Sequence, residues 1–118
     1  MYFNTLFTKN VTFARHYVLF CINLYIVMAK FFLITYDLKT PGQNYSKLYE
    51  SIKAFGDWQH PMESTWFLKV GDEIKAETIY NSVRPNMDSN DNLFIVDITD
   101  RNYYGWLSKN FWPWFKNT

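Results

Sequence analysis

Acidic side chains are the first candidates for chemistry in this chain. Asp37 ends the apolar run "FFLITYDL" (31–38) and stands shortly before a Pro-Gly turn. A carboxylate at the end of a buried strand can either cap the turn and the helix that follow, or bind a cation. Magnesium usually takes one or two carboxylates together with substrate oxygens and water. One Asp37 is therefore a poor magnesium site by itself, whereas a two-fold axis could bring in a second copy.

The other reactive residue types form weaker patterns. The stretch "DSND" (88–91) is acidic, but Asp, Ser and Asn are common turn formers, which favours a plain loop. His16 and His60 are far apart in the sequence, and a lone histidine usually packs or donates a hydrogen bond. Cys21 lies in the atypical N-terminal segment, so a role for this cysteine as a catalytic nucleophile is not favoured. The sequence has no Cys/His zinc cluster, P-loop, dinucleotide-binding glycine pattern or nucleophile elbow.

Composition narrows the function classes. A chain of 118 residues has room for one domain. Its net charge of +1 means that any contact with RNA or DNA must depend on a local basic patch. A single cysteine allows no intrachain disulfide and favours a reducing, cytoplasmic setting. Aromatic residues make up 21% of the chain, so much apolar area must be covered, in part by a partner copy.

The first 28 residues differ from the rest. Their apolar stretch "HYVLFCINLYIVM" is interrupted by Asn23 and is too short to cross a bilayer. Three interpretations remain open: a membrane-leaning or signal-like segment, an extra element packed on the domain, and an extension ahead of a start at Met28. A span over residues 17–36 would have to include Lys30 and the first strand, so a membrane protein is not favoured.

The remaining chain predicts an α+β fold. The expected elements are a strand at 31–38, a helix at 45–55, a short strand at 58–60 that breaks at Pro61, a strand at 64–70, a helix at 73–84 and a strand at 93–98. This β-α-β-β-α-β order is typical of the ferredoxin-like sandwich, in which two helices cover one face of a four-stranded antiparallel sheet. The first strand is apolar on both faces, so the other face also needs a cover. We expect a second protomer to cover this face, because two-fold homodimers are the commonest oligomers.

The division expected along the chain is an N-terminal extension (1–28), a ferredoxin-like domain (29–100) and an aromatic C-terminal tail (101–118). The tail, "RNYYGWLSKNFWPWFKNT", could stack bases, but a helix or arm clamped onto its own domain or its partner's is the commoner use of such residues. Ser108 can cap a helix there. Pro113 limits that helix to about one turn unless it lies in the first turn.

Three pieces of the sequence carry a resemblance to a known family. They are "YDL" (36–38), "STWFL" (64–68) and "DSNDNLFIV" (88–96). Over residues 29–100 the chain resembles the small, dimeric CRISPR-associated Cas two family, especially its SinR-like branch. It is similar, more distantly, to the VapD toxin ribonucleases.

That resemblance implies a ferredoxin-like homodimer with Asp37 at the position of the family's strand-end aspartate. In nuclease members this residue binds a divalent metal, here Mg²⁺, at the dimer interface and is catalytic. Tyr36 would position the backbone, and Ser64 and Thr65 would start the strand beside the aspartate. Family members often have several basic residues after the aspartate, where this chain has only Lys39 and Lys47.

Two functions remain open at this point. One is a magnesium-dependent endoribonuclease that acts on single-stranded RNA in antiviral defence or as a toxin. The other is a non-catalytic dimeric scaffold that binds a protein partner or nucleic acid, since many members of this fold family show little or no hydrolysis. Both predict a homodimer.

Overall fold

The computed structural model of the protein describes residues 29–40 and 42–116. The strands and helices of the fold belong to one compact unit, residues 30–117. The predictions for residues 1–28, with His16 and Cys21, lie outside the described residues. Within the described ranges, none of the helices has the length and apolar character needed to cross a membrane.

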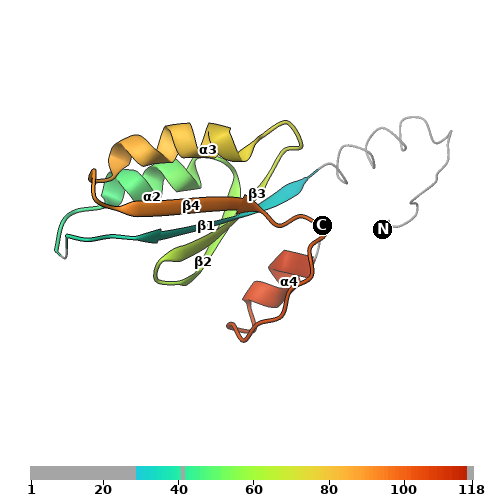
Figure 1. The fold of residues 1–118 in the computed structure, drawn as a ribbon. Helices are drawn as coiled ribbons and strands as arrows, with labels where there is room; N and C mark the ends of the chain where they lie inside the picture. Colours follow the sequence, from blue (N-terminus) through green and yellow to red (C-terminus); the bar gives the residue numbers. More distant parts are fainter. Residues whose placement is uncertain (1–28, 41, 117–118) are drawn as a thin grey trace, which may run out of the picture. The chain divides into compact units, whose positions relative to one another are not determined.

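The sheet and its helices follow the predicted order. The elements are β1 (Lys30–Asp37), α2 (Ser46–Lys53), β2 (Asp57–Met62), β3 (Thr65–Val70), α3 (Ala76–Val83), a 3-10 turn (Arg84–Asn86), β4 (Asn92–Asp97) and α4 (Phe111–Lys116). The four strands form one sheet in the order β2-β3-β1-β4, and all neighbours are antiparallel (Figure 1). The predicted α+β class with a four-stranded antiparallel sheet is therefore confirmed.

The strand β2 differs from its prediction. The sequence suggested a break at Pro61, but the strand continues through this proline to Met62. The edge position explains the difference, because a proline that points its missing N–H away from the sheet removes no ladder hydrogen bond. The pairing of β2 with β3 also shifts register between Gln59 and Met62.

The helices are shorter than predicted at both ends. The first stops at Lys53, short of the predicted end at residue 55, and the second begins at Ala76, after the predicted start at 73. Pro85 lies just past the second helix in the 3-10 turn, where its missing N–H is tolerated. Helix boundaries are weakly specified by sequence because end turns exchange readily between helix and turn geometry.

The main core lies between the sheet and the pair α2 and α3. Each helix buries two residues one turn apart, Leu48 and Ile52 in α2 and Ile79 and Val83 in α3. They pack against alternate residues of the central strands, including Phe32, Ile34, Tyr36, Trp66, Leu68 and Val70. Strand alternation sends the intervening side chains to the opposite face.

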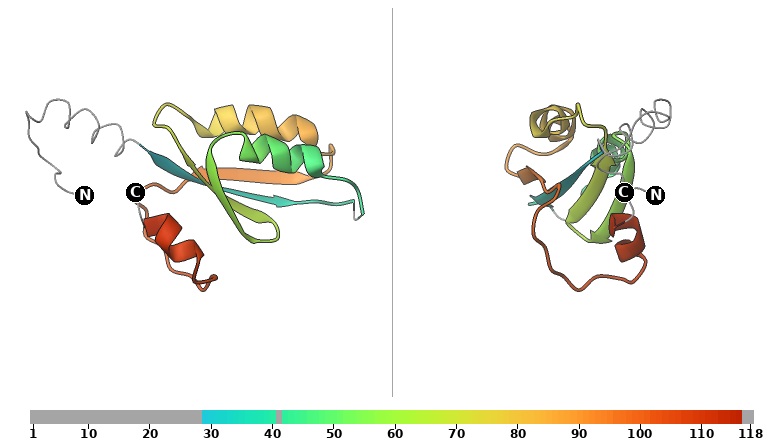
Figure 2. Two further views of the ribbon diagram at one scale, coloured as in Figure 1. Left: turned by 180° about the vertical axis from the view of Figure 1, so that it is seen from behind. Right: turned by 90° about the vertical axis from the view of Figure 1, so that its right-hand side faces the viewer.

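The opposite face of the sheet is partly covered by the chain's own tail. Helix α4 places the buried Phe111 and Phe115 against Phe31 and Phe67, with ring centroids 5.0 Å apart for Phe31 and Phe115 and 4.8 Å apart for Phe67 and Phe111. Figure 2 shows α4 on the side of the sheet away from α2 and α3. The predicted clamp of the tail on its own domain is confirmed. The expectation that a second protomer covers this face is wrong for the part around Phe31, because α4 already buries it.

The tail leaves the other half of this face uncovered. Phe94 of the edge strand β4, which pairs with Thr35 across the sheet, is 61% exposed. Asp37 lies at the end of β1 that borders this uncovered half. The fold thus presents the strand-end carboxylate beside an exposed apolar side chain.

Candidate functional site

Asp37 is the last residue of the central strand β1. Alternation along the strand places it on the same face as Leu33 and Thr35. Its side chain is 64% exposed, so the carboxylate pays no burial cost. Asp37 is therefore open to a ligand from solvent.

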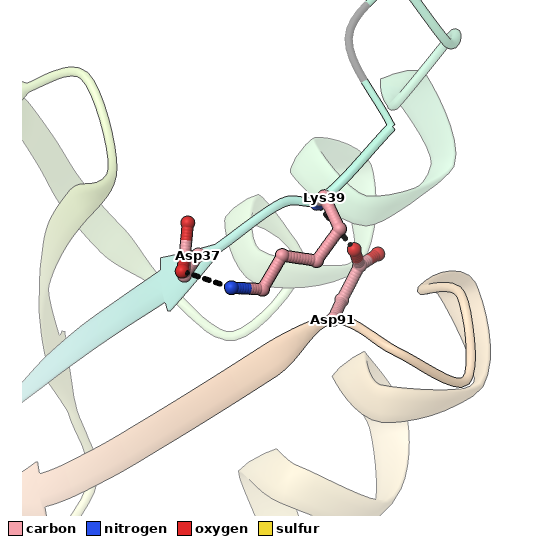
Figure 3. Close-up of polar contacts among 3 residues, drawn as sticks. All are labelled: Asp37, Lys39 and Asp91. Atoms are coloured by element: carbon pink, nitrogen blue, oxygen red, sulfur yellow. Dashed lines mark hydrogen bonds and ion pairs between the residues drawn. The ribbon is translucent and has the colours of Figure 1, made fainter.

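The carboxylate of Asp37 already has a cationic partner on its own chain. The Lys39 ammonium donates to Asp37 Oδ2 at 2.7 Å, and Figure 3 shows the lysine side chain reaching back along the strand to make this contact. The hydrogen bond to Asp37, together with its negative charge, raises the pKa of Lys39. Solvent screens an exposed ion pair of this kind, so a competing cation can displace the lysine.

Asp91, rather than Asp37, holds the turn that follows β1. Its side chain belongs to a residue that is only 5% exposed, and its Oδ1 accepts the backbone N–H of Lys39 at 2.7 Å (Figure 3). Its Oδ2 accepts the backbone N–H of Asp88 at 2.9 Å. At the helix start, Asn44 Oδ1 accepts the N–H of Ser46. The interpretation of Asp37 as the cap of the turn or helix is wrong, because the side-chain oxygens of Asp91 and Asn44 accept these backbone N–H groups.

The stretch 88–91 lies before β4 and is largely turn, as predicted, but Asp91 has a larger role than a turn former. It links two backbone segments more than 45 residues apart in the chain. Sequence reasoning missed this link because only the pairing of β1 with β4 brings the two segments together.

Tyr36 lies on the opposite face from Asp37. Its side chain is buried under the helices, where its hydroxyl accepts a hydrogen bond from Trp66 Nε1 at 2.9 Å and donates to the Glu63 carbonyl at 3.5 Å. Its backbone N–H donates to the Ser64 carbonyl at 3.1 Å. The structure therefore brings the backbone of Tyr36 and Ser64 close to Asp37 but directs the phenol away from it.

Thr65 begins β3 and shares the Asp37 face. It pairs with Thr35, and the two hydroxyl oxygens are 3.1 Å apart. Thr35 lies two residues before Asp37 on the same strand face, and the sequence interpretation did not single it out as a site residue. Its position opposite Thr65 depends on the register of β1 with β3.

Burial makes Tyr36 a source of pH dependence at high pH. Removal of the phenol from water raises its pKa from the usual 10.0 to about 12. A raised pKa means that the folded state holds its proton more tightly, so this stabilisation is complete below pH 10 and is lost as the pH rises through 12. Urea unfolding at pH 8, 10 and 11.5 should show a steeper loss of stability for the native chain than for Tyr36→Phe. Equal slopes for the two proteins would contradict the assignment to Tyr36.

One chain supplies one carboxylate at this site. Among residues 29–40 and 42–116, no three side chains of the His, Cys, Asp and Glu types gather closely enough to hold a metal ion. Asp37 with the two threonine hydroxyls offers one anionic and two neutral oxygens. A single chain is therefore a poor magnesium site by itself, because Mg²⁺ usually takes one or two carboxylates together with substrate oxygens and water.

His60 has a packing role. Its ring stacks on Trp66 with centroids 3.8 Å apart, and its Nε2 lies 2.9 Å from the Glu63 carbonyl oxygen. This agrees with the interpretation of a lone histidine as a structural residue.

Comparisons with family models, with curated proteins and with solved structures found no match to this chain.

Proposed function

We propose that this protein is a homodimeric, magnesium-dependent endoribonuclease related to the SinR-like branch of the Cas two family. It would act on RNA in antiviral defence or as a toxin, in the cytoplasm. The observation that carries the proposal is Asp37, an exposed carboxylate at the end of a central strand, on the sheet face that the helices do not cover.

The proposed fold name is ferredoxin-like. It is supported by the β-α-β-β-α-β order from β1 to β4, by the strand order β2-β3-β1-β4 and by the two helices on one face. In this arrangement two consecutive strand-helix-strand units interleave, which puts β1 and β3 in the centre. The centre is where the Asp37 carboxylate and the hydroxyls of Thr35 and Thr65 are found.

A second copy of the chain would complete the site. Phe94 presents exposed apolar surface beside Asp37, and a partner seated there would bury that surface. If the two copies are related by a two-fold axis near this edge, each contributes its Asp37 to the same metal site. Mg²⁺ held there would stabilise charge on a scissile phosphate and lower the pKa of a bound water. Lys39 would release Asp37 as the metal binds.

The decisive experiment is RNA cleavage by the purified full chain. A labelled single-stranded RNA should be cut with Mg²⁺ and left intact with EDTA, and Asp37→Ala should be as inactive as the EDTA sample. Asp72→Ala is the matched control, since it removes an exposed aspartate from a turn outside this site. Cleavage by Asp37→Ala at the native rate would eliminate Asp37 as the metal ligand. Light scattering should give a dimer mass, and a monomer at micromolar concentration would remove the shared site.

A second candidate function is a dimeric scaffold that binds without hydrolysis. It is favoured by the Lys39–Asp37 ion pair, which occupies the carboxylate, and by the single carboxylate per chain. This function predicts binding of nucleic acid or a protein partner with no metal-dependent turnover. Turnover that disappears in Asp37→Ala would rule it out.

A further inference from the structure

A pocket of about 580 Å³ lies between the sheet and the tail. Its floor is apolar and includes Leu33, Phe67, Phe111 and Phe115, while the loop before α4 forms one wall. The volume is within the range of small-molecule sites, which are mostly apolar with a few polar groups at the rim. Every lining residue belongs to the same compact unit of the chain.

Aromatic side chains at the rim of this pocket face solvent. Tyr104 and Trp106 are essentially fully exposed, at 104% and 97% of their reference areas. Tyr103 is half exposed and stacks on Trp112, with ring planes 18° apart. Exposed rings gathered at a concave site favour a flat ligand, because each ring can stack on one of its faces.

The charge of the same segment points to an anionic ligand. Residues 101–118 contain Arg101, Lys109 and Lys116 but no Asp or Glu. Arg101 lines the pocket, and the Lys116 ammonium lies 5.8 Å from the centre of the Trp112 ring. The tail segment is therefore basic although the net charge of the whole chain is only +1, and Arg101 also interacts electrostatically with Asp97. Basic side chains interleaved with aromatic rings suit a phosphate backbone with unstacked bases.

We infer that the pocket binds single-stranded nucleic acid: one unpaired base enters it and stacks on the rim aromatics, and Arg101 contacts an adjacent phosphate. A duplex cannot enter in this way, because its bases are stacked and paired. A protein partner is less well matched, since the pocket is concave and of small-molecule size.

The pocket and Asp37 lie on the same face of the sheet. Leu33 lines the pocket and Asp37 follows four residues later on β1, about 13 Å along the strand. A strand anchored in the pocket could therefore continue past Thr35 towards the carboxylate. In this respect the inference rests on the proposed function, because the bound strand would be the RNA that is cleaved. Binding itself does not require Asp37.

Fluorescence anisotropy with a labelled 12-nucleotide oligouridylate tests the inference on the full chain, in EDTA so that hydrolysis does not interfere. Tyr104→Ala and Trp106→Ala should each weaken binding about tenfold, the effect of losing one base-aromatic stack. Arg101→Gln should weaken binding and reduce the slope of log K against log salt by about one. Tyr80→Ala is the matched control, because it removes an exposed aromatic from α3 and should leave affinity unchanged.

Two altered probes separate base stacking from charge. An abasic oligomer of the same length and a 12-base-pair duplex should both bind at least about tenfold more weakly. Asp37→Ala should bind the single strand with the affinity of the native chain. Cleavage and binding are thus tested separately: an absence of cleavage by the native chain would contradict the proposed function and leave the inference about binding intact. Native affinity in both Tyr104→Ala and Trp106→Ala would overturn the inference. The inference would also be overturned if Trp106→Ala dissociated a dimer and left the affinity for the oligonucleotide unchanged. The rim would then be an interface between two copies of the chain.

Discussion

Phe111→Ala is expected to lower the free energy of unfolding by roughly 3–5 kcal/mol, the usual cost of removing a buried phenylalanine ring. Phe111 is 2% exposed and packs against Phe67 on the sheet and against Phe115 one turn later in α4. Its loss leaves a void under α4 that neighbouring rings fill only in part. Because α4 packs on the sheet through its aromatic side chains, part of the effect should appear as release of the tail rather than as global unfolding.

Two measurements distinguish these effects. Urea unfolding gives the global loss of stability, and limited trypsin digestion after Lys109 reports tail release in the absence of denaturant. Tyr104→Ala is the control, because its fully exposed side chain should cost less than about 0.5 kcal/mol. A Phe111→Ala chain as stable and as protease-resistant as the control would mean that α4 does not cover the sheet in solution.

Asp91→Ala is expected to lower the free energy of unfolding by about 2–4 kcal/mol. The buried carboxylate accepts the backbone N–H groups of Lys39 and Asp88, and hydrogen bonds to charged groups are worth roughly 1.5–3 kcal/mol each. In the variant, water can hydrogen-bond to the two freed N–H groups, so the expected loss of stability is smaller than the sum of the two hydrogen-bond contributions. The change also frees the segment after Asp37, so the Lys39 side chain should no longer hold the carboxylate in one place.

Urea unfolding checks the size of this effect, and hydrogen exchange at the Lys39 amide checks its location. Asp88→Ala is the matched control in the same loop. The Asp88 carboxylate accepts one exposed hydrogen bond, from Gln43 at 3.2 Å, so its removal should cost well below 1 kcal/mol. Similar losses for the two variants would show that the buried carboxylate has no special role.

The elements of this fold were largely predictable from local patterns. The apolar run in 31–38 and the helical spacing of apolar residues in 45–55 each located an element within a few residues of its observed bounds. Pro61 was misinterpreted as a break, because its effect depends on whether its strand is central or at an edge. That distinction depends on strand order, which local sequence does not encode.

The candidate site was predictable only in part. Asp37 was identified from its place at the strand end, and its face followed from alternation. Its exposure and its partner Lys39 were not predicted, nor was the role of Asp91, since each depends on where distant segments meet. Thr65 was named through the resemblance, whereas Thr35 was not identified as a site residue, and the two become neighbours through the register of β1 and β3.

By itself, the sequence determined the α+β class, the order of the elements from β1 to β4, and the existence of an apolar surface on both faces of the first strand. These follow from periodicity and burial, which are properties of neighbouring residues. Only the tertiary structure decided that the chain's own α4 covers part of the second face, leaves Phe94 exposed beside Asp37 and forms a pocket with Trp106 at its rim. The physical reason is that an apolar side chain is stabilised by burial against any well-packed apolar surface. The sequence therefore indicates which residues are buried, but not which segment covers them. The choice of cover depends on how far the tail can reach and on which rings then pack.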